Sequence, residues 1–124
     1  MKIFEPNFKD FKFKNDKYRS ERGGQTAMIE IDCVCGQPIM IYQKDGYKKQ
    51  HLYRTYLNRI FYPENLEILQ RNVSVEKNLP ELICPSCGRK IGTPMKHDEG
   101  RLAFGLIMGV FVRKRLPKQN RFEK

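Results

Sequence analysis

Two pairs of cysteines are the residues of this 124-residue chain whose spacing points most directly to chemistry. One residue separates Cys33 from Cys35, two separate Cys84 from Cys87, and the chain has no other cysteine. Four thiolates suit a closed tetrahedral zinc site with bonds of about 2.3 Å. The sequence therefore predicts one structural Zn²⁺ held by all four cysteines.

Iron in a rubredoxin-like site and redox-active thiols are the alternatives to zinc. A disulfide within the first pair would be strained, which weakens the redox interpretation. A catalytic zinc keeps an open coordination position, and four thiolates leave none. The two histidines, His51 and His97, lie in polar stretches and are expected to be solvated. Because the sequence contains no nucleophile–base constellation and no glycine-rich phosphate loop, we predict that the protein is not an enzyme.

A glycine follows the second cysteine of each pair, Gly36 in the first and Gly88 in the second. The chain must turn back at these positions, often with a positive φ that glycine adopts readily. Pro85 stiffens the turn inside the second pair. We therefore expect each pair at the tip of a β-hairpin.

This arrangement resembles the zinc-ribbon family, in which two short cysteine knuckles join β-hairpins around one Zn²⁺. The resemblance covers residues 27–92 and is carried by Cys33, Cys35, Gly36, Cys84, Pro85, Cys87 and Gly88. It departs from the usual pattern in the short first spacer and in the 48 residues between the pairs. The pattern is also similar to that of small microbial proteins. The family resemblance implies a structural metal and, commonly, a role in transcription, translation or other nucleic-acid machinery.

The patterns around the cysteines predict an α+β protein that consists mainly of small antiparallel β structure. Residues 26–32 alternate between apolar and polar side chains and predict a strand, and residues 38–43 are rich in β-forming types. Asp45 and Gly46 indicate a hairpin turn into a second strand over residues 52–57, for which a helix over 52–61 is the alternative.

Two further segments are ambiguous in the sequence. Residues 64–72 fit a short helix or a strand. Residues 98–116 favour a C-terminal helix, with Asp98 as its N-cap and basic residues at its end. Gly105 and Gly109 lower helix propensity, so a buried strand is the alternative there.

Three segments make up the expected organisation of the chain. Residues 1–25 form an extended arm that interleaves phenylalanine with lysine, residues 26–116 form the zinc-ribbon-like domain, and residues 117–124 form a polar tail. The arm could stack its rings on nucleic-acid bases, or its phenylalanines could dock on the protein's own core. We favour docking, because several exposed phenylalanines would promote aggregation.

The net charge of +10 favours a polyanionic partner. The excess of basic over acidic side chains is largest in residues 101–124, which hold seven basic side chains and one acidic side chain. Tyrosines alternate with basic residues in the predicted hairpin, a surface suited to RNA, although a half-buried tyrosine-rich sheet with solvated lysines fits equally well. The candidate nucleic-acid contacts are Lys44, Lys48, Lys49, Arg54, Arg59, Arg113, Lys114 and Arg115.

The leading hypothesis is therefore a small structural-zinc protein that binds nucleic acid, with RNA favoured, in translation or transcription machinery. The alternative is a protein-interaction module or accessory subunit whose apolar run Leu102–Val112 docks on a partner or on a second copy. That run has eleven residues, too few to span a bilayer, although peripheral membrane contact is a third hypothesis. The N-terminus lacks the apolar stretch of a secretory signal, so we expect a cytoplasmic protein.

Overall fold

A computed structural model describes residues 4–7, 11–22, 26–46, 52–97 and 100–117. The described part contains eight strands and five short helical segments, the latter including two 3₁₀ helices. Their bounds in chain order are α1 Lys17–Arg22, β1 Thr26–Cys33, β2 Pro38–Asp45, β3 Arg54–Tyr56, η2 Leu57–Arg59, β4 Ile60–Tyr62, α2 Glu64–Glu67, α3 Leu69–Asn72, η3 Glu76–Asn78, β5 Leu82–Ile83, β6 Lys90–His97, β7 Arg101–Leu106 and β8 Phe111–Arg115.

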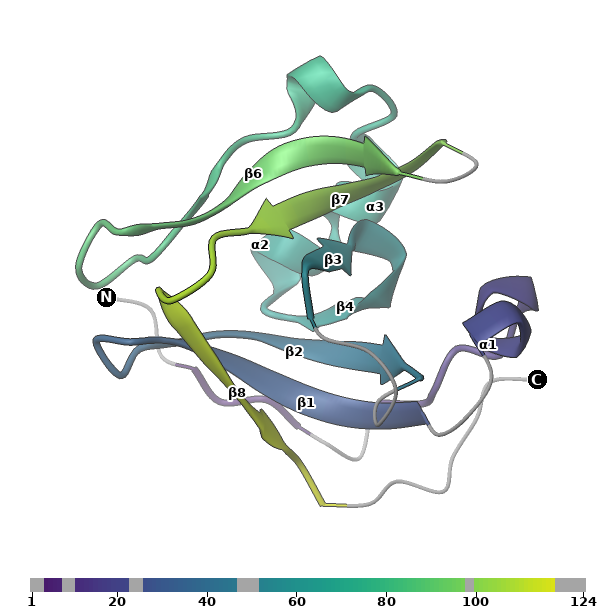
Figure 1. The fold of residues 1–124 in the computed structure, drawn as a ribbon, viewed down its shortest axis with the longest axis horizontal. Helices are drawn as coiled ribbons and strands as arrows, with labels where there is room; N and C mark the ends of the chain where they lie inside the picture. Colours follow the sequence, from purple (N-terminus) through teal and green to yellow (C-terminus); the bar gives the residue numbers. More distant parts are fainter. Residues whose placement is uncertain (1–3, 8–10, 23–25, 47–51, 98–99, 118–124) are drawn as a thin grey trace.

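The strands form two four-stranded antiparallel sheets that lie one above the other (Figure 1). The first sheet has the order β4-β2-β1-β8 and the second the order β3-β7-β6-β5. The prediction of a mainly antiparallel α+β fold is thus confirmed. Strand β7 lies in the second sheet and β8 in the first, so the chain crosses between the sheets after Leu106.

Strand β1 shows why the first sheet has apolar side chains on both faces. Ala27, Ile29 and Ile31 alternate along the strand and join the apolar core that lies between the sheets. Met28 points to the opposite face, where it packs with Phe11 and Phe13 of the N-terminal segment. The first sheet is therefore covered by the second sheet on one side and by the N-terminal segment on the other.

The phenylalanines of the N-terminal segment dock on the protein, as the favoured sequence interpretation predicts. Phe11 is 7% exposed and Phe13 is 3% exposed. Gln43 on β2 fixes the same segment to the sheet, because its side-chain amide accepts a hydrogen bond from the Lys14 backbone N–H and donates one to the Lys14 carbonyl oxygen. Phe8 lies outside the described residues.

The predicted hairpin at Asp45 and Gly46 is wrong, although Gly46 does have a positive φ of 69°. Strand β2 pairs with β1 and β4, whereas β3 pairs with β7 in the other sheet. Of the strand predicted over residues 52–57, only Arg54–Tyr56 form a strand, β3, and Leu57 begins the 3₁₀ turn η2 that leads to β4. Residues 64–72, ambiguous in the sequence, form the helices α2 and α3.

The predicted C-terminal helix is also wrong, and the strand alternative holds. The segment forms β7 and β8, separated by a turn in which Gly109 has a φ of 89°. A right-handed helix cannot contain a residue with that φ. The β-branched and aromatic side chains on either side of the turn are well suited to strands. Asp98, the predicted N-cap, lies outside the described residues.

A buried arginine ties the N-terminal segment to the first sheet. Arg59 is 1% exposed, and its guanidinium binds Asp16 through both Nη atoms, at 3.1 and 2.7 Å. Its Nε donates to Asp45 Oδ2 at 2.9 Å. The Arg59 hydrogen bonds hold the pKa of Asp16 below its usual value despite the opposing effect of burial. One cation thus connects three segments that are distant in the sequence.

We expect the variant Arg59→Met to lower the free energy of unfolding by about 3–5 kcal/mol, because it leaves the buried Asp45 carboxylate without a counter-charge. Urea unfolding measures this loss. The matched control is Arg71→Met, which removes an arginine that is 58% exposed and pairs with Glu67 on the surface. The control should lose about 0.5 kcal/mol or less. Equal unfolding midpoints for the two variants would contradict the prediction.

Candidate metal centre

The four cysteines meet at one end of the molecule, at the tips of two hairpins. Cys33 and Cys35 lie where β1 turns into β2, and Cys84 and Cys87 lie where β5 turns into β6. All four Sγ atoms are within 4.8 Å of one another. Two of the sulfur–sulfur distances join the two hairpins: 3.6 Å between Cys33 and Cys87, and 3.7 Å between Cys35 and Cys84. The predicted cysteine cluster is confirmed.

These sulfur–sulfur distances fit a metal ion. A tetrahedron with metal–sulfur bonds of about 2.3 Å has edges of about 3.8 Å. A disulfide bond is far shorter, at about 2.05 Å, and none of the four cysteines forms one. The donor set could therefore hold one metal ion without rearrangement of the backbone.

The two cysteine turns have corresponding hydrogen bonds, each of which spans one residue more in the second turn. In the first, the Cys33 N–H donates to the Gln37 carbonyl at 2.8 Å and the Gly36 N–H to the Cys33 carbonyl at 2.8 Å. In the second, the Cys84 N–H donates to the Arg89 carbonyl at 2.8 Å and the Gly88 N–H to the Cys84 carbonyl at 3.0 Å. These bonds turn each chain back on itself.

The positive φ predicted for the two glycines is confirmed. Gly36 has a φ of 101° and Gly88 a φ of 78°. A Cβ atom at either position would meet no heavy atom within 4 Å. The backbone conformation, and not a lack of space, is therefore what favours glycine there.

Each turn contributes one buried and one exposed thiol. Cys33 and Cys84 are each 1% exposed and belong to the apolar core between the sheets, whereas Cys35 and Cys87 are exposed. The centre thus extends the core at one end and is open to solvent at its outer side. Val34, inside the first turn, donates its N–H to the Val110 carbonyl at 3.1 Å, so the crossing between β7 and β8 is attached to the centre.

Arg89 is a member of the centre that the sequence analysis missed. Its Nη1 lies 3.8 Å from the sulfurs of both Cys33 and Cys87. A cation there offsets negative charge on the thiolates. Burial raises the pKa of Cys33, but hydrogen bonds from the Cys35 backbone and thiol and from Arg89 outweigh it and lower that pKa to about 6. The sequence shows that Arg89 directly follows Gly88, but it does not show that the Arg89 side chain lies against the sulfurs.

Two of the predicted nucleic-acid contacts are wrong, because their side chains are buried. Arg59 is bound by two carboxylates, as described above. Lys44 is 7% exposed, and its Nζ donates to the Asp45 carbonyl oxygen at 3.2 Å. Arg54 is half-buried, and Lys48 and Lys49 lie outside the described residues. Most of the described tyrosines of the predicted RNA-binding face are also inaccessible: Tyr42 and Tyr56 are buried, and Tyr53 is exposed.

The three predicted contacts on β8 are exposed on an edge strand. Arg113, Lys114 and Arg115 follow one another at the end of β8, which is an edge strand of the first sheet. Lys114 Nζ lies 3.1 Å from Glu30 Oε2 on the neighbouring strand, and this hydrogen bond raises the pKa of Lys114. Burial and the Glu30 carboxylate also raise the pKa of Asp32 to about 7.

The remaining candidate residues are placed differently from the expectation. His97 is half-buried, with Nδ1 2.8 Å from the Tyr56 hydroxyl oxygen. His51 lies outside the described residues. The apolar run Leu102–Val112 is largely used in the protein's own fold: Ala103 and Phe104 are fully buried, while Met108 and Val112 are about half exposed.

Comparisons with protein-family models, curated proteins and solved structures found no match to this chain. The resemblance to zinc ribbons therefore stays a prediction that rests on the cysteine pattern. Within the described ranges, no helix is both long and apolar enough to cross a membrane.

We expect Cys84→Ser to abolish metal binding and to unfold the protein. Binding of a structural Zn²⁺ contributes about 10–16 kcal/mol in small peptides, which is as large as the whole stability of a typical domain. Loss of chemical-shift dispersion in an amide NMR spectrum measures the effect. Ser86→Ala is the matched control, since Ser86 is exposed in the same turn and is not a ligand. A well-folded, metal-free Cys84→Ser protein would refute a structural metal.

Proposed function

We propose that the protein is a zinc-stabilised nucleic-acid-binding protein that contacts phosphates through the exposed basic strand β8. The observation that carries the proposal is the run of three exposed basic side chains at the end of this edge strand, in a chain with a net charge of +10. Lysine and arginine on a sheet edge also prevent unwanted pairing with other chains, and the binding experiment below separates the two roles.

Zinc is the proposed metal because the donor set is four thiolates. Soft thiolate ligands in a tetrahedral arrangement are typical of Zn²⁺ and of iron–sulfur centres, and structural zinc sites commonly have four cysteines. Such a site has no open position for a water molecule or a substrate, which assigns the metal a structural role and argues against catalysis at the centre. Four reduced cysteines also fit a cytoplasmic location.

We favour contact with phosphates over recognition of bases, because most of the described tyrosines of the predicted RNA-binding face are buried whereas the basic side chains of β8 are exposed. The proposal of RNA as the preferred partner depended on a tyrosine-rich hairpin face, and most of its described members are buried. Charged side chains on a strand bind the backbone of any nucleic acid through counterion release. We therefore propose a nucleic-acid partner in translation or transcription machinery and leave the choice between RNA and DNA to measurement.

Elemental analysis of the purified protein should give one zinc per chain, because the four cysteines form a single tetrahedral donor set. A competing chelator should remove the zinc and unfold the protein reversibly. If the protein contained iron in place of zinc, the identity of the metal would be wrong, but the four cysteines would still be its ligands. The absence of any metal would refute both the zinc assignment and the proposed source of stability.

Fluorescence anisotropy with labelled single-stranded RNA and DNA should show binding that weakens as salt increases. Each phosphate contact adds about 0.7 to the slope of log K against log salt for single strands. The double variant Arg113→Ala/Arg115→Ala should therefore lower the slope by about 1.4 and weaken binding to all sequences alike. Lys77→Ala is the control, because Lys77 is exposed in η3, near the other sheet. Unchanged binding by the double variant would refute β8 as the contact.

A further inference from the structure

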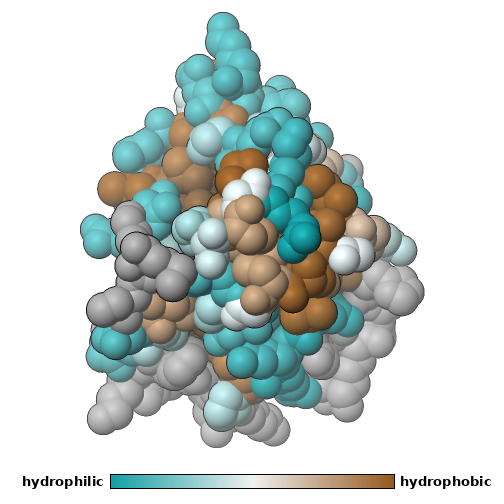
Figure 2. Space-filling view, turned by 90° about the vertical axis from the view of Figure 1, so that its left-hand side faces the viewer, coloured by the Kyte–Doolittle hydropathy of each residue, from teal (hydrophilic) through white to brown (hydrophobic). Residues whose placement is uncertain are grey.

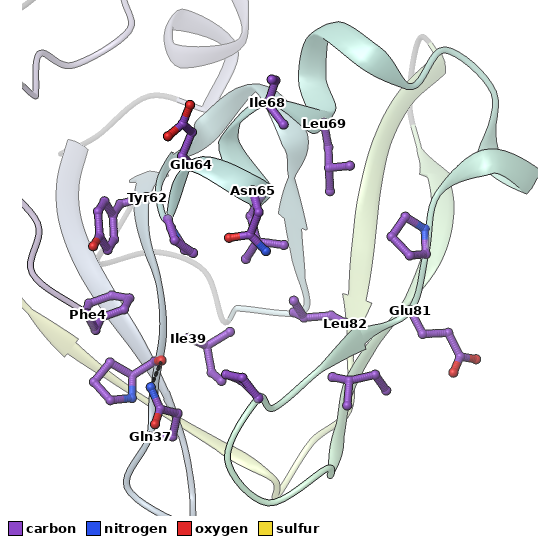
Figure 3. A pocket seen from close by; sticks show the side chains of 16 residues that line it. Phe4, Gln37, Ile39, Tyr62, Glu64, Asn65, Ile68, Leu69, Glu81 and Leu82 are labelled. Atoms are coloured by element: carbon purple, nitrogen blue, oxygen red, sulfur yellow. Dashed lines mark hydrogen bonds between the residues drawn. The ribbon is translucent and has the colours of Figure 1, made fainter. Parts of the chain in front are cut away.

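A groove of about 1120 Å³ opens beside the metal centre, between the two sheets (Figure 3). Helices α2 and α3 line one side of it, and the first residues of β2, strand β5, Tyr62 of β4 and Phe4 are among the other lining residues. Its apolar side chains include Phe4, Ile39, Tyr62, Leu66, Leu69 and Leu82. Figure 2 shows hydrophobic residues among hydrophilic ones on the side of the molecule that lies on the left in Figure 1. A groove of this size exceeds the usual 300–1,000 Å³ of a small-molecule pocket.

The charge of the groove is opposite to that of the chain. Glu64 and Glu81 line it, together with the amide side chains of Gln37 and Asn65, and Glu81 is already paired with Lys90, whose Nζ lies 3.1 Å from Glu81 Oε1. Its lining, within the described part of the chain, contains no lysine and no arginine, although the chain has 24 of them against 14 acidic residues. A polyanion would be repelled there, so this surface does not serve the nucleic-acid partner proposed above. An apolar ligand with a positive charge is complementary to it.

Both sheets end at the groove. Strand β4 is an edge of the first sheet and β5 is an edge of the second, and Tyr62, Leu82 and Ile83 from these strands line the groove. An edge strand presents backbone N–H and C=O groups that can pair with an added strand. Ile83 is 43% exposed, which leaves an apolar side chain at the border of the groove.

The walls of the groove are fixed before any ligand binds. The Phe4 and Tyr62 rings pack edge to face with centroids 4.9 Å apart, and the Tyr62 hydroxyl accepts the Glu5 backbone N–H at 3.0 Å. Ile39 and Leu82 on the floor are 4% and 3% exposed and belong to the core between the sheets. A ligand would therefore lose little free energy in ordering the site.

We propose that this groove binds an extended segment of a partner polypeptide that carries apolar side chains and at least one lysine or arginine. The apolar side chains enter the groove, the cation pairs with Glu64, and part of the backbone lies along the edge of β5. Strand β5 has two residues, so backbone pairing would involve a short part of the segment. The proposal goes beyond nucleic-acid binding and uses a different surface.

Selection from a phage-displayed library of random peptides, against the intact metal-loaded protein, tests the proposal. The enriched peptides should combine apolar residues with lysine or arginine. Ile83→Ser and Glu64→Lys should each weaken the binding of a synthesised enriched peptide about tenfold. Val75→Ser and Glu76→Lys are the matched controls, because Val75 and Glu76 are exposed but do not line the groove. The controls should bind as the wild type does.

Three outcomes would overturn the proposal: no enriched family of peptides, a family rich in acidic residues, or a family whose binding the groove variants do not change. Concentration-dependent self-association that Ile83→Ser abolishes would show that a second copy of the chain, and not a partner, occupies the groove. The double variant Arg113→Ala/Arg115→Ala should bind the peptide normally, so failure of the nucleic-acid proposal and failure of this one are distinguishable.

Discussion

The two sheets are held together by one shared apolar layer that ends in the four cysteines. Cys33 and Cys84 are both members of this layer and also the inner thiols of the centre. Each sheet contributes one hairpin tip, and the sulfur pairs that lie 3.6 and 3.7 Å apart each join the two tips. A metal ion bound there would fix the distance between the sheets at this end. The groove between β2, β5 and α2 depends on the same spacing, because Gln37 and Pro85 of the two tips line it.

On the opposite face of the first sheet, the N-terminal segment is held by hydrogen bonds and an ion pair as well as by its packed phenylalanine rings. Asp16 and Lys14 bring the N-terminal segment to Arg59 and Gln43, which are almost fully buried. Buried groups of this kind are costly to leave unpaired, so the segment is held in one place while its phenylalanines pack. The chain therefore uses its positive charge in two ways: Arg59 is an internal tie, whereas Arg113 and Arg115 remain on the surface.

The sequence predicted the local features, which depend on residues close together in the chain. Alternation identified β1, and the glycines after the cysteines identified both turns with their positive φ. It did not predict pairings that depend on distant residues. Asp45 and Gly46 have the form of a hairpin turn, but β3 finds its partner in β7, near residue 104. Arg59 looked like a surface cation because its carboxylate partners lie 43 and 14 positions away in the chain. The apolar run near residue 105 suited helix and strand alike, and Gly109 at the turn decided between them.

The pairing of β8 with β1 has a consequence for synthesis on the ribosome. The paired residues are 78 to 86 positions apart, from Cys33 with Phe111 to Ile29 with Arg115. The first hairpin emerges long before its neighbour, with one edge unpaired and two thiols exposed to the surroundings. Such an edge can pair with other nascent chains, and contacts between distant residues form slowly. The nascent protein therefore has a period of exposure that ends when β8 has been made and the crossing from β7 has brought it to β1.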